Sequence, residues 1–112
     1  MCGIFAVLNN KHLELTNVKE QFNKCKNRGP EYSKLENLQS INSYIGFHRL
    51  AINGVDDTHS NQPFFIDNIY LVCNGEIYNH KELFNTLNIT PKSKSDCEII
   101  IHLYKKYGIE QT

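Results

Sequence analysis

Cys2 is the residue of this chain with the greatest potential for chemistry. The initiator methionine is normally removed when the second residue is small, so the mature chain would start at Cys2, with an α-amine beside its thiol. A free α-amine titrates at about pH 7.7–8.0, and an N-terminal amine serves as the base for threonine nucleophiles. A thiolate formed in this way could attack a carbonyl carbon. The alternative is that Cys2 is a small buried residue at the start of a strand.

Asn74-Gly75 and Arg49 could complete an acyl-transfer site. Such a site needs hydrogen-bond donors for the oxyanion, and Asn74 offers a side-chain amide next to the unobstructed backbone N–H of Gly75. Arg49 lies in an apolar stretch, where its guanidinium needs a partner and is suited to bind a carboxylate with two parallel hydrogen bonds. The alternatives are an ordinary Asn-Gly turn and, for Arg49, a structural ion pair or an edge position facing water.

Acidic residues could bind an ammonium group of a ligand. Glu76 and Asp96 each lie at the boundary of an expected element. Because Asp96 follows the expected helix cap Ser95, its alternative role is to stabilise the helix dipole. Glu98 and His102 are four residues apart without a nearby third ligand, so a surface pair is favoured over a metal site. The sequence therefore predicts no metal site, and it has no Gly-rich phosphate loop that would bind ATP.

The amino-terminal half of the chain must position these residues with strands and one helix. The apolar run 3–8 predicts a strand that begins almost at the first residue. Asn17 and Glu20 resemble a helix N-cap with its reciprocal partner. A second strand is expected over 43–52, with a bulge or a close backbone approach at Gly46.

The carboxyl-terminal half predicts a hairpin followed by two helices. Strands over 64–66 and 69–72 flank a two-residue turn of hairpin type. One helix starts at Asn79 and another at Ser95, each with a Glu three residues later that could complete a capping box. Gly108 ends the last helix. The sum is an α+β fold.

Length and composition exclude several classes of protein. The chain has 112 residues, 40% of them hydrophobic, which is enough for one domain or a piece of one. Twelve basic and twelve acidic residues give a formal net charge of zero, so neither nucleic acid nor an anionic membrane is an expected partner. Four scattered cysteines without a Cys-x-x-Cys pair indicate reduced, mostly buried thiols. No apolar run is long enough for a membrane span, and a basic leader is lacking, so we expect a cytoplasmic location.

Six blocks in the chain appear in an order that resembles class II glutamine amidotransferases. The similarity is greatest to the glutaminase domain of glutamine-hydrolysing asparagine synthetase, and it spans nearly the whole chain. The blocks are Met1-Cys2-Gly3-Ile4, Arg28-Gly29-Pro30, Gly46-Phe47-His48-Arg49-Leu50-Ala51-Ile52, Gln62-Pro63, Asn74-Gly75-Glu76-Ile77-Tyr78-Asn79 and Ser95-Asp96-Cys97-Glu98.

The resemblance implies a fold, a substrate and a role for each matched residue. The fold would be the N-terminal-nucleophile hydrolase type, a four-layer αββα sandwich with antiparallel sheets, and the substrate L-glutamine. Hydrolysis to glutamate and ammonia would pass through a thioester on Cys2, and the ammonia would serve asparagine formation from aspartate. The implied roles are the nucleophile Cys2, the oxyanion hole Asn74 and Gly75, the α-carboxylate site Arg49, the α-ammonium site Glu76 and Asp96, and pocket backbone at Leu50, Ile52 and Asn53. No cofactor is expected in this chain, because ATP and Mg would belong to the synthetase domain.

The chain also departs from the pattern of the family. Glu31 replaces the usual Asp after Arg-Gly-Pro, Asn53 replaces a common acidic residue, and Asn61 replaces a small residue before Gln-Pro. We interpret 1–112 as a partial glutaminase domain, incomplete at its C-terminus and without the synthetase domain. Sheet edges and apolar faces would then be uncovered, and we expect a separate synthetase chain or a second copy of this chain to cover them. The alternative function is a catalytically silent, truncated remnant that acts as an interaction module.

Overall fold

β3 (Ser43–Arg49) is the central strand of a three-stranded antiparallel sheet in this computed structural model, which describes residues 2–51 and 56–112. β1 (Gly3–Val7) and β2 (Tyr32–Leu38) pair with it on either side. Nearly every residue of β3 is buried, as expected of a strand covered on both faces. Gly3 lies opposite His48, so this register brings the start of β1 next to the end of β3.

α1 (Leu15–Asn23) covers one face of this sheet. Its Val18 and Phe22 are buried, and the Phe22 ring stacks on His48 with ring centroids 4.0 Å apart. His48 Nε2 lies 2.8 Å from the carbonyl oxygen of Phe22 and its Nδ1 lies 2.7 Å from Ser33 Oγ. A carbonyl only accepts, so Nε2 carries the proton and Nδ1 accepts from the hydroxyl. His48 is therefore a satisfied core residue.

A second, two-stranded sheet consists of β4 (Phe64–Ile66) and β5 (Ile69–Leu71). The turn between them is the expected two-residue one, and both Asp67 (φ 50°) and Asn68 (φ 63°) have left-handed backbone conformations. The apolar side chains of one hairpin face join the core around Phe64, Cys97 and Ile101. The hairpin thereby rests on the last helix.

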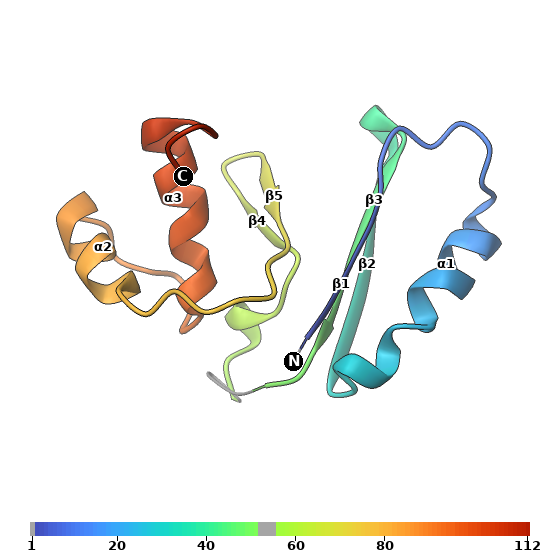
Figure 1. The fold of residues 1–112 in the computed structure, drawn as a ribbon, viewed down its shortest axis with the longest axis horizontal. Coiled ribbons are helices and arrows are strands. Elements are labelled where there is room, and N and C mark those ends of the chain that lie inside the picture. The colour runs from blue at the N-terminus through green and yellow to red at the C-terminus, as the bar shows by residue number, and fades with distance from the viewer. Residues whose placement is uncertain (1, 52–55) are drawn as a thin grey trace.

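Two helices and four short 3₁₀ segments complete the described chain. α2 (His80–Leu87) packs against α3 (Ile99–Tyr107), where the Phe84 ring meets His102 edge to face at 5.7 Å. The 3₁₀ segments are Lys26–Arg28, Gln39–Ile41, Thr58–Ser60 and Asp96–Glu98. Figure 1 shows the order across the molecule, with α1 outside the three-stranded sheet, then the hairpin, then α3 and α2. The predicted α+β class with antiparallel sheets is confirmed.

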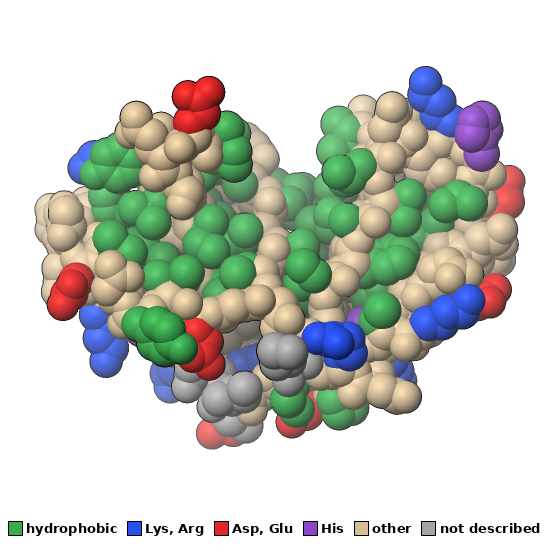
Figure 2. Space-filling model, in the orientation of Figure 1, with side chains coloured by type: hydrophobic (Ala, Val, Ile, Leu, Met, Phe, Trp, Pro, Cys, Tyr) green, Lys and Arg blue, Asp and Glu red, His purple; other side chains and the backbone are tan. Residues whose placement is uncertain are grey.

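Hydrophobic side chains remain exposed between the two sheets. Figure 2 shows them on both walls of a depression between the sheet and the hairpin. Ile4 on β1 is 50% exposed, and the stacked rings of Phe65 and Tyr70 on the hairpin are 56% and 39% exposed. Since neighbouring residues of a strand point to opposite faces, Phe65 and Tyr70 lie on the side of the hairpin away from its core.

Several expected helix starts differ in the structure. α1 begins at Leu15 after Glu14, not at Asn17, and no side chain caps it. Asn79 precedes α2 but makes no capping hydrogen bond, so the predicted capping box there is wrong. Ser95 does cap, but it caps the 3₁₀ segment by accepting from the Cys97 N–H at 3.3 Å. The N-cap side chains predicted for α1 and α2 thus do not form these helix ends.

Strand predictions were more accurate, with two corrections. Gly46 has no bulge, because its register with both neighbours is continuous. Gly46 is instead a position where the ring of Phe22 lies close to the backbone, since a Cβ there would lie 2.5 Å from Phe22 Cε2. β2 was missed, because its apolar Leu35 and Leu38 are three residues apart and the residues between them are polar or charged, which is not the period-2 pattern of a strand.

Candidate active site

A cavity of about 430 Å³ lies where the start of β1, the end of β3, the segment after β5 and the 3₁₀ segment at 96–98 meet. Its lining residues are Cys2, Phe47, Arg49, Leu50, Ser60, Gln62, Cys73, Asn74, Gly75, Glu76, Tyr78, Ser95, Asp96 and Cys97. Seven of the residues predicted from the sequence are in this set. The other two, Ile52 and Asn53, lie outside the described residues.

Cys2 lies at the cavity because β1 pairs with β3. Its Sγ accepts a hydrogen bond from the backbone N–H of Leu50 at 3.3 Å and lies 3.5 Å from the Leu50 carbonyl oxygen. The guanidinium of Arg28 donates from Nε to the Cys2 carbonyl at 3.3 Å. The side chain is half-buried, so the thiol is held in place and still reaches the cavity.

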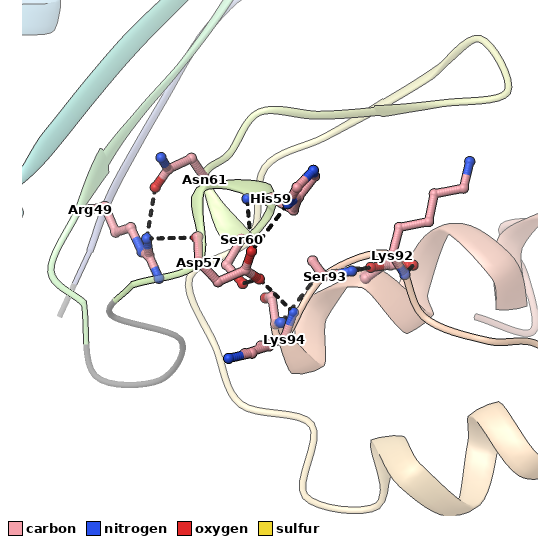
Figure 3. Close-up of polar contacts among 10 residues, drawn as sticks. Arg49, Asp57, His59, Ser60, Asn61, Lys92, Ser93 and Lys94 are labelled. Carbon is pink, nitrogen blue, oxygen red and sulfur yellow. Dashed lines mark hydrogen bonds and ion pairs between the residues drawn. The ribbon is translucent and has the colours of Figure 1, made fainter.

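Arg49 is buried at the last position of β3, with 7% of its surface exposed. Its Nη1 donates to Asn61 Oδ1 at 2.8 Å and to the Asp57 carbonyl at 3.4 Å (Figure 3). A guanidinium has five N–H donors in a fixed plane, a geometry that suits the binding of a carboxylate by two parallel hydrogen bonds. Asn61, a departure from the family pattern, is thus a partner of Arg49.

Asn74 and Gly75 follow β5 in an exposed segment. The side chain of Gln62 anchors this segment through Cys73. The Gln62 side chain is 4% exposed and bonds the backbone of Cys73 twice, accepting from its N–H at 2.6 Å and donating to its carbonyl at 3.2 Å. The Cys97 thiol donates to the Gly75 carbonyl at 3.5 Å. These contacts fix the backbone on both sides of Asn74.

Asp96 lies across the cavity from β3 and supports the same segment. Its Oδ2 accepts from the Ile77 N–H at 2.6 Å, which ties the 3₁₀ segment to the residues after Gly75. Glu76 is exposed and lines the cavity beside it. Two carboxylates and one guanidinium therefore surround the space next to the Cys2 thiol.

Comparisons with known proteins identify the family of this chain. A family described as a glutamine amidotransferase domain matches residues 1–112. The chain belongs to the glutamine amidotransferase family. It is 39% identical to the glutamine-hydrolyzing asparagine synthetase 1 of Arabidopsis thaliana over 98% of this chain and 19% of that protein. For the Bos taurus asparagine synthetase the identity is 40%, over 100% of this chain and 20% of the relative, and for the Pisum sativum root enzyme it is 44%, over 96% and 19%. The chain therefore spans about a fifth of the length of these curated relatives.

A second thiol at the site of this amidotransferase domain is poorly suited to be the nucleophile. Burial, the neighbouring Cys73 thiol and the charge of Asp96 together raise the pKa of Cys97 to about 12. Cys97 is therefore protonated near neutral pH, and only a thiolate attacks efficiently. None of the four cysteines forms a disulfide bond in this structure, and Cys97 is fully buried, whereas Cys2, Cys25 and Cys73 are half-buried.

Other sequence interpretations change once the domain is seen folded. Glu98 and His102 are a buried pair rather than a surface pair, with side chains 1% and 9% exposed and His102 Nε2 3.3 Å from Glu98 Oε1.

In the described ranges 2–51 and 56–112, no three His, Cys, Asp or Glu side chains are arranged to hold a metal ion. Within those ranges, no helix has the length and apolar character needed to cross a bilayer.

Sequence reasoning missed three polar residues that support the site. Asp57 and Ser60 form the turn that holds Arg49, and Gln62 holds Cys73. Gln62 was identified only as part of a Gln-Pro motif. Nothing in the sequence indicated Asp57, because a polar residue in a loop has many possible partners.

Proposed function

We propose that this chain hydrolyses L-glutamine to glutamate and ammonia with Cys2 as the nucleophile. The proposal depends mainly on one observation: the half-buried Cys2 thiol shares a cavity with Arg49, Asn74, Gly75 and two carboxylates. A guanidinium and an acidic pair suit the two charged groups of an α-amino acid. The family match and the names of the relatives support glutamine as that amino acid.

Substrate binding in this proposal uses charges on opposite sides of the cavity. Arg49 binds the α-carboxylate, and Glu76 with Asp96 binds the α-ammonium. Leu50 lines the pocket next to Cys2, whereas Ile52 and Asn53, which the family resemblance also assigns to it, lie outside the described residues. The side-chain amide of glutamine then reaches the Cys2 sulfur.

Chemistry follows in two steps. After removal of Met1, the α-amine of Cys2 accepts the thiol proton, and the sulfur adds to the amide carbon. Asn74 Nδ2 and the Gly75 N–H donate to the oxyanion. The C–N bond breaks, the α-ammonium returns the proton to the leaving ammonia, and water then cleaves the thioester to release glutamate.

The use of the ammonia is a further part of the proposal. The relatives are named as glutamine-hydrolyzing asparagine synthetases, and by analogy the ammonia would serve asparagine formation from aspartate. This chain matches only about a fifth of their length, so ATP and Mg would be used by a synthetase part elsewhere. We propose either a separate synthetase chain or a second copy as the partner, supported by the exposed rings of Phe65 and Tyr70.

Two further proposals concern the layers of the fold and the location of the protein in the cell. The order of helix, sheet, hairpin and helices in Figure 1 supports a four-layer αββα sandwich of the N-terminal-nucleophile type. Four scattered cysteines without a Cys-x-x-Cys pair favour reduced thiols, which supports the proposal of a cytoplasmic location.

Release of ammonia and glutamate from glutamine tests the proposed function. Intact mass first establishes that the purified chain begins at Cys2. We expect the wild type to release both products, and Cys2→Ala to release neither. Cys25→Ala is the matched control, because this half-buried thiol does not line the cavity. Equal release by wild type and Cys2→Ala would eliminate Cys2 as the nucleophile, and no release by the wild type would favour the catalytically silent remnant.

A further inference from the structure

The carboxylate of Asp57 joins two segments that are 37 residues apart in the chain. Its Oδ1 accepts from the His59 N–H at 3.0 Å, and its Oδ2 accepts from Ser60 Oγ at 2.7 Å (Figure 3). These two bonds cap the short helical turn 58–60 and are local. Oδ2 also accepts from the Lys94 N–H at 2.8 Å, which a turn cap does not require. The side chain is 12% exposed, so these bonds are largely shielded from water.

One end of this connection holds the guanidinium at the cavity. The turn that Asp57 caps carries two partners of Arg49 Nη1, the Asp57 carbonyl at 3.4 Å and Asn61 Oδ1 at 2.8 Å. Arg49 belongs to β3 and to the three-stranded sheet. These hydrogen bonds attach the turn to Arg49, which is the side of the proposed site that binds the carboxylate.

The other end holds the acidic side of the cavity. Lys94 is two residues before Asp96, and Ser93 is anchored by its N–H and hydroxyl to the fully buried Glu98 at 2.7 and 2.6 Å. Asp96 in turn fixes the Ile77 N–H at 2.6 Å. Hydrogen bonds thus hold the segment from 93 to 96 to Glu98 and Ile77, and the Asp57 bond connects this segment to the turn that holds Arg49.

We propose that Asp57 is a positioning residue that sets the separation of Arg49 and Asp96, and thereby selects ligands with a carboxylate and an ammonium on one carbon. This inference rests on the proposed function, which gives Arg49 and Asp96 their ligand groups. Hydrogen bonds from Ser60, Lys94 and His59 lower the pKa of Asp57, so the acceptor stays ionised near neutral pH. An ionised acceptor makes stronger bonds to backbone N–H groups than a neutral one does.

A substitution that separates the two functions of Asp57 tests the inference. In Asp57→Ser, the hydroxyl still caps the turn by accepting from the His59 N–H, but it is too short to reach the Lys94 N–H. The adjacent exposed residue gives the matched control, Asp56→Ser, which removes the same charge. Both are made in full-length Cys2→Ala protein, in which binding is measured without turnover, and equal thermal unfolding midpoints check the fold.

Two ligands distinguish positioning from a local disturbance. Calorimetry gives the Kd for glutamine and for 4-carbamoylbutanoate, which is glutamine without its α-amino group. We expect Asp57→Ser to weaken glutamine binding about tenfold, because a group displaced by even 1 Å loses much of its interaction. Binding of 4-carbamoylbutanoate, which needs only Arg49, and all binding to Asp56→Ser should change less than about twofold.

Three results would overturn the inference. Glutamine binding could be unchanged in Asp57→Ser, both ligands could weaken by the same factor, or Asp56→Ser could reproduce the effect. A failure of the proposed function has a different signature, since protein that begins at Cys2 would then bind glutamine but release no ammonia. If glutamine does not bind to Cys2→Ala at all, both proposals are wrong.

Discussion

Arg49 is the residue whose geometry most limits what the cavity can bind. Its planar guanidinium already serves Asn61 Oδ1 and the Asp57 carbonyl, and the proposal asks it to hold a carboxylate as well. A lysine keeps the charge but has one compact donor group instead of the fork. We expect Arg49→Lys to raise the KM for glutamine at least tenfold, with kcat changed less than about threefold. A KM within twofold of the wild type in steady-state assays would exclude a direct contact with the substrate.

Glu98 is a residue whose effect on stability should depend on pH. Burial raises its pKa, but bonds from the Lys92 N–H, the Ser93 hydroxyl, His102 and the Ser93 N–H outweigh this, so the net pKa lies below the ordinary 4.5. A carboxylate with a depressed pKa stabilises the fold above about pH 4.5, and that contribution is lost as the pH falls through the folded-state pKa.

The matched variant for this residue is Glu98→Gln. We expect it to lower the free energy of unfolding at pH 7 by about 2 kcal/mol, because charged hydrogen bonds to Ser93 and Lys92 are weakened. The difference from the wild type should shrink as the pH is lowered below 4.5 in urea unfolding series. A difference that stays constant down to pH 3 would mean that the charge of Glu98 contributes nothing.

The residues that line the cavity were predicted from the sequence, but the residues that hold them in position were not. The types of Cys2, Arg49, Asn74 and Asp96 limit what each can do, and each now lines one cavity. Asp57 could not be found in the same way, because its function depends on a partner 37 residues away. Long-range backbone contacts leave no trace in local residue patterns.

At the scale of single elements, the packing of α1 on β3 depends on Gly46. A Cβ on Gly46 would lie 2.5 Å from Phe22 Cε2, whereas one on Gly3 would meet its nearest neighbour at 3.4 Å. We expect Gly46→Ala to lower the free energy of unfolding by about 1–3 kcal/mol through overpacking, and Gly3→Ala to cost less. Adding Phe22→Leu to Gly46→Ala should cost less than the sum of the single changes. Additive effects in urea unfolding would show that the ring and the new methyl group do not collide.

Elements with a strong apolar pattern were predicted better than those without one. The hairpin and α3 carry apolar residues and turn signals that agree with their environment. β2 instead has its leucines three residues apart, at Leu35 and Leu38, which is not the alternation of a strand. Its charged residues Lys34 and Glu36 form an ion pair with 2.5 Å between Nζ and Oε1. As an edge strand it depends on hydrogen bonds to β3, which are tertiary and cannot be read from its own residues.

At the scale of the whole molecule, exposed apolar surface between the sheets should make this chain associate with itself. Ile4, Leu8, Phe65 and Tyr70 are 39–71% exposed, and the formal net charge of zero gives little repulsion between copies. We expect sedimentation equilibrium to show an average mass that rises with protein concentration. Phe65→Ser should reduce this rise, whereas Ile109→Ser, at a still more exposed residue after α3, should not. A single monomeric species at every concentration would contradict self-association.

Residue patterns predicted the α+β class but not the order of the elements across the molecule. Periodicity predicted an α+β fold, but it does not specify which sheet faces which helix. That depends on side-chain contacts such as Phe22 on His48 and Phe64 near Ile101, which join distant segments.

The most direct test of the central claim is to trap the covalent intermediate. Protein that begins at Cys2 is mixed with glutamine, quenched in acid within the first turnovers and digested, and the peptides are examined by mass spectrometry. We predict a γ-glutamyl thioester on the peptide that begins with Cys2, and on no peptide that carries Cys25, Cys73 or Cys97. Glutamate release at an unchanged rate by Cys2→Ala, together with an adduct on another cysteine or on none, would contradict the account.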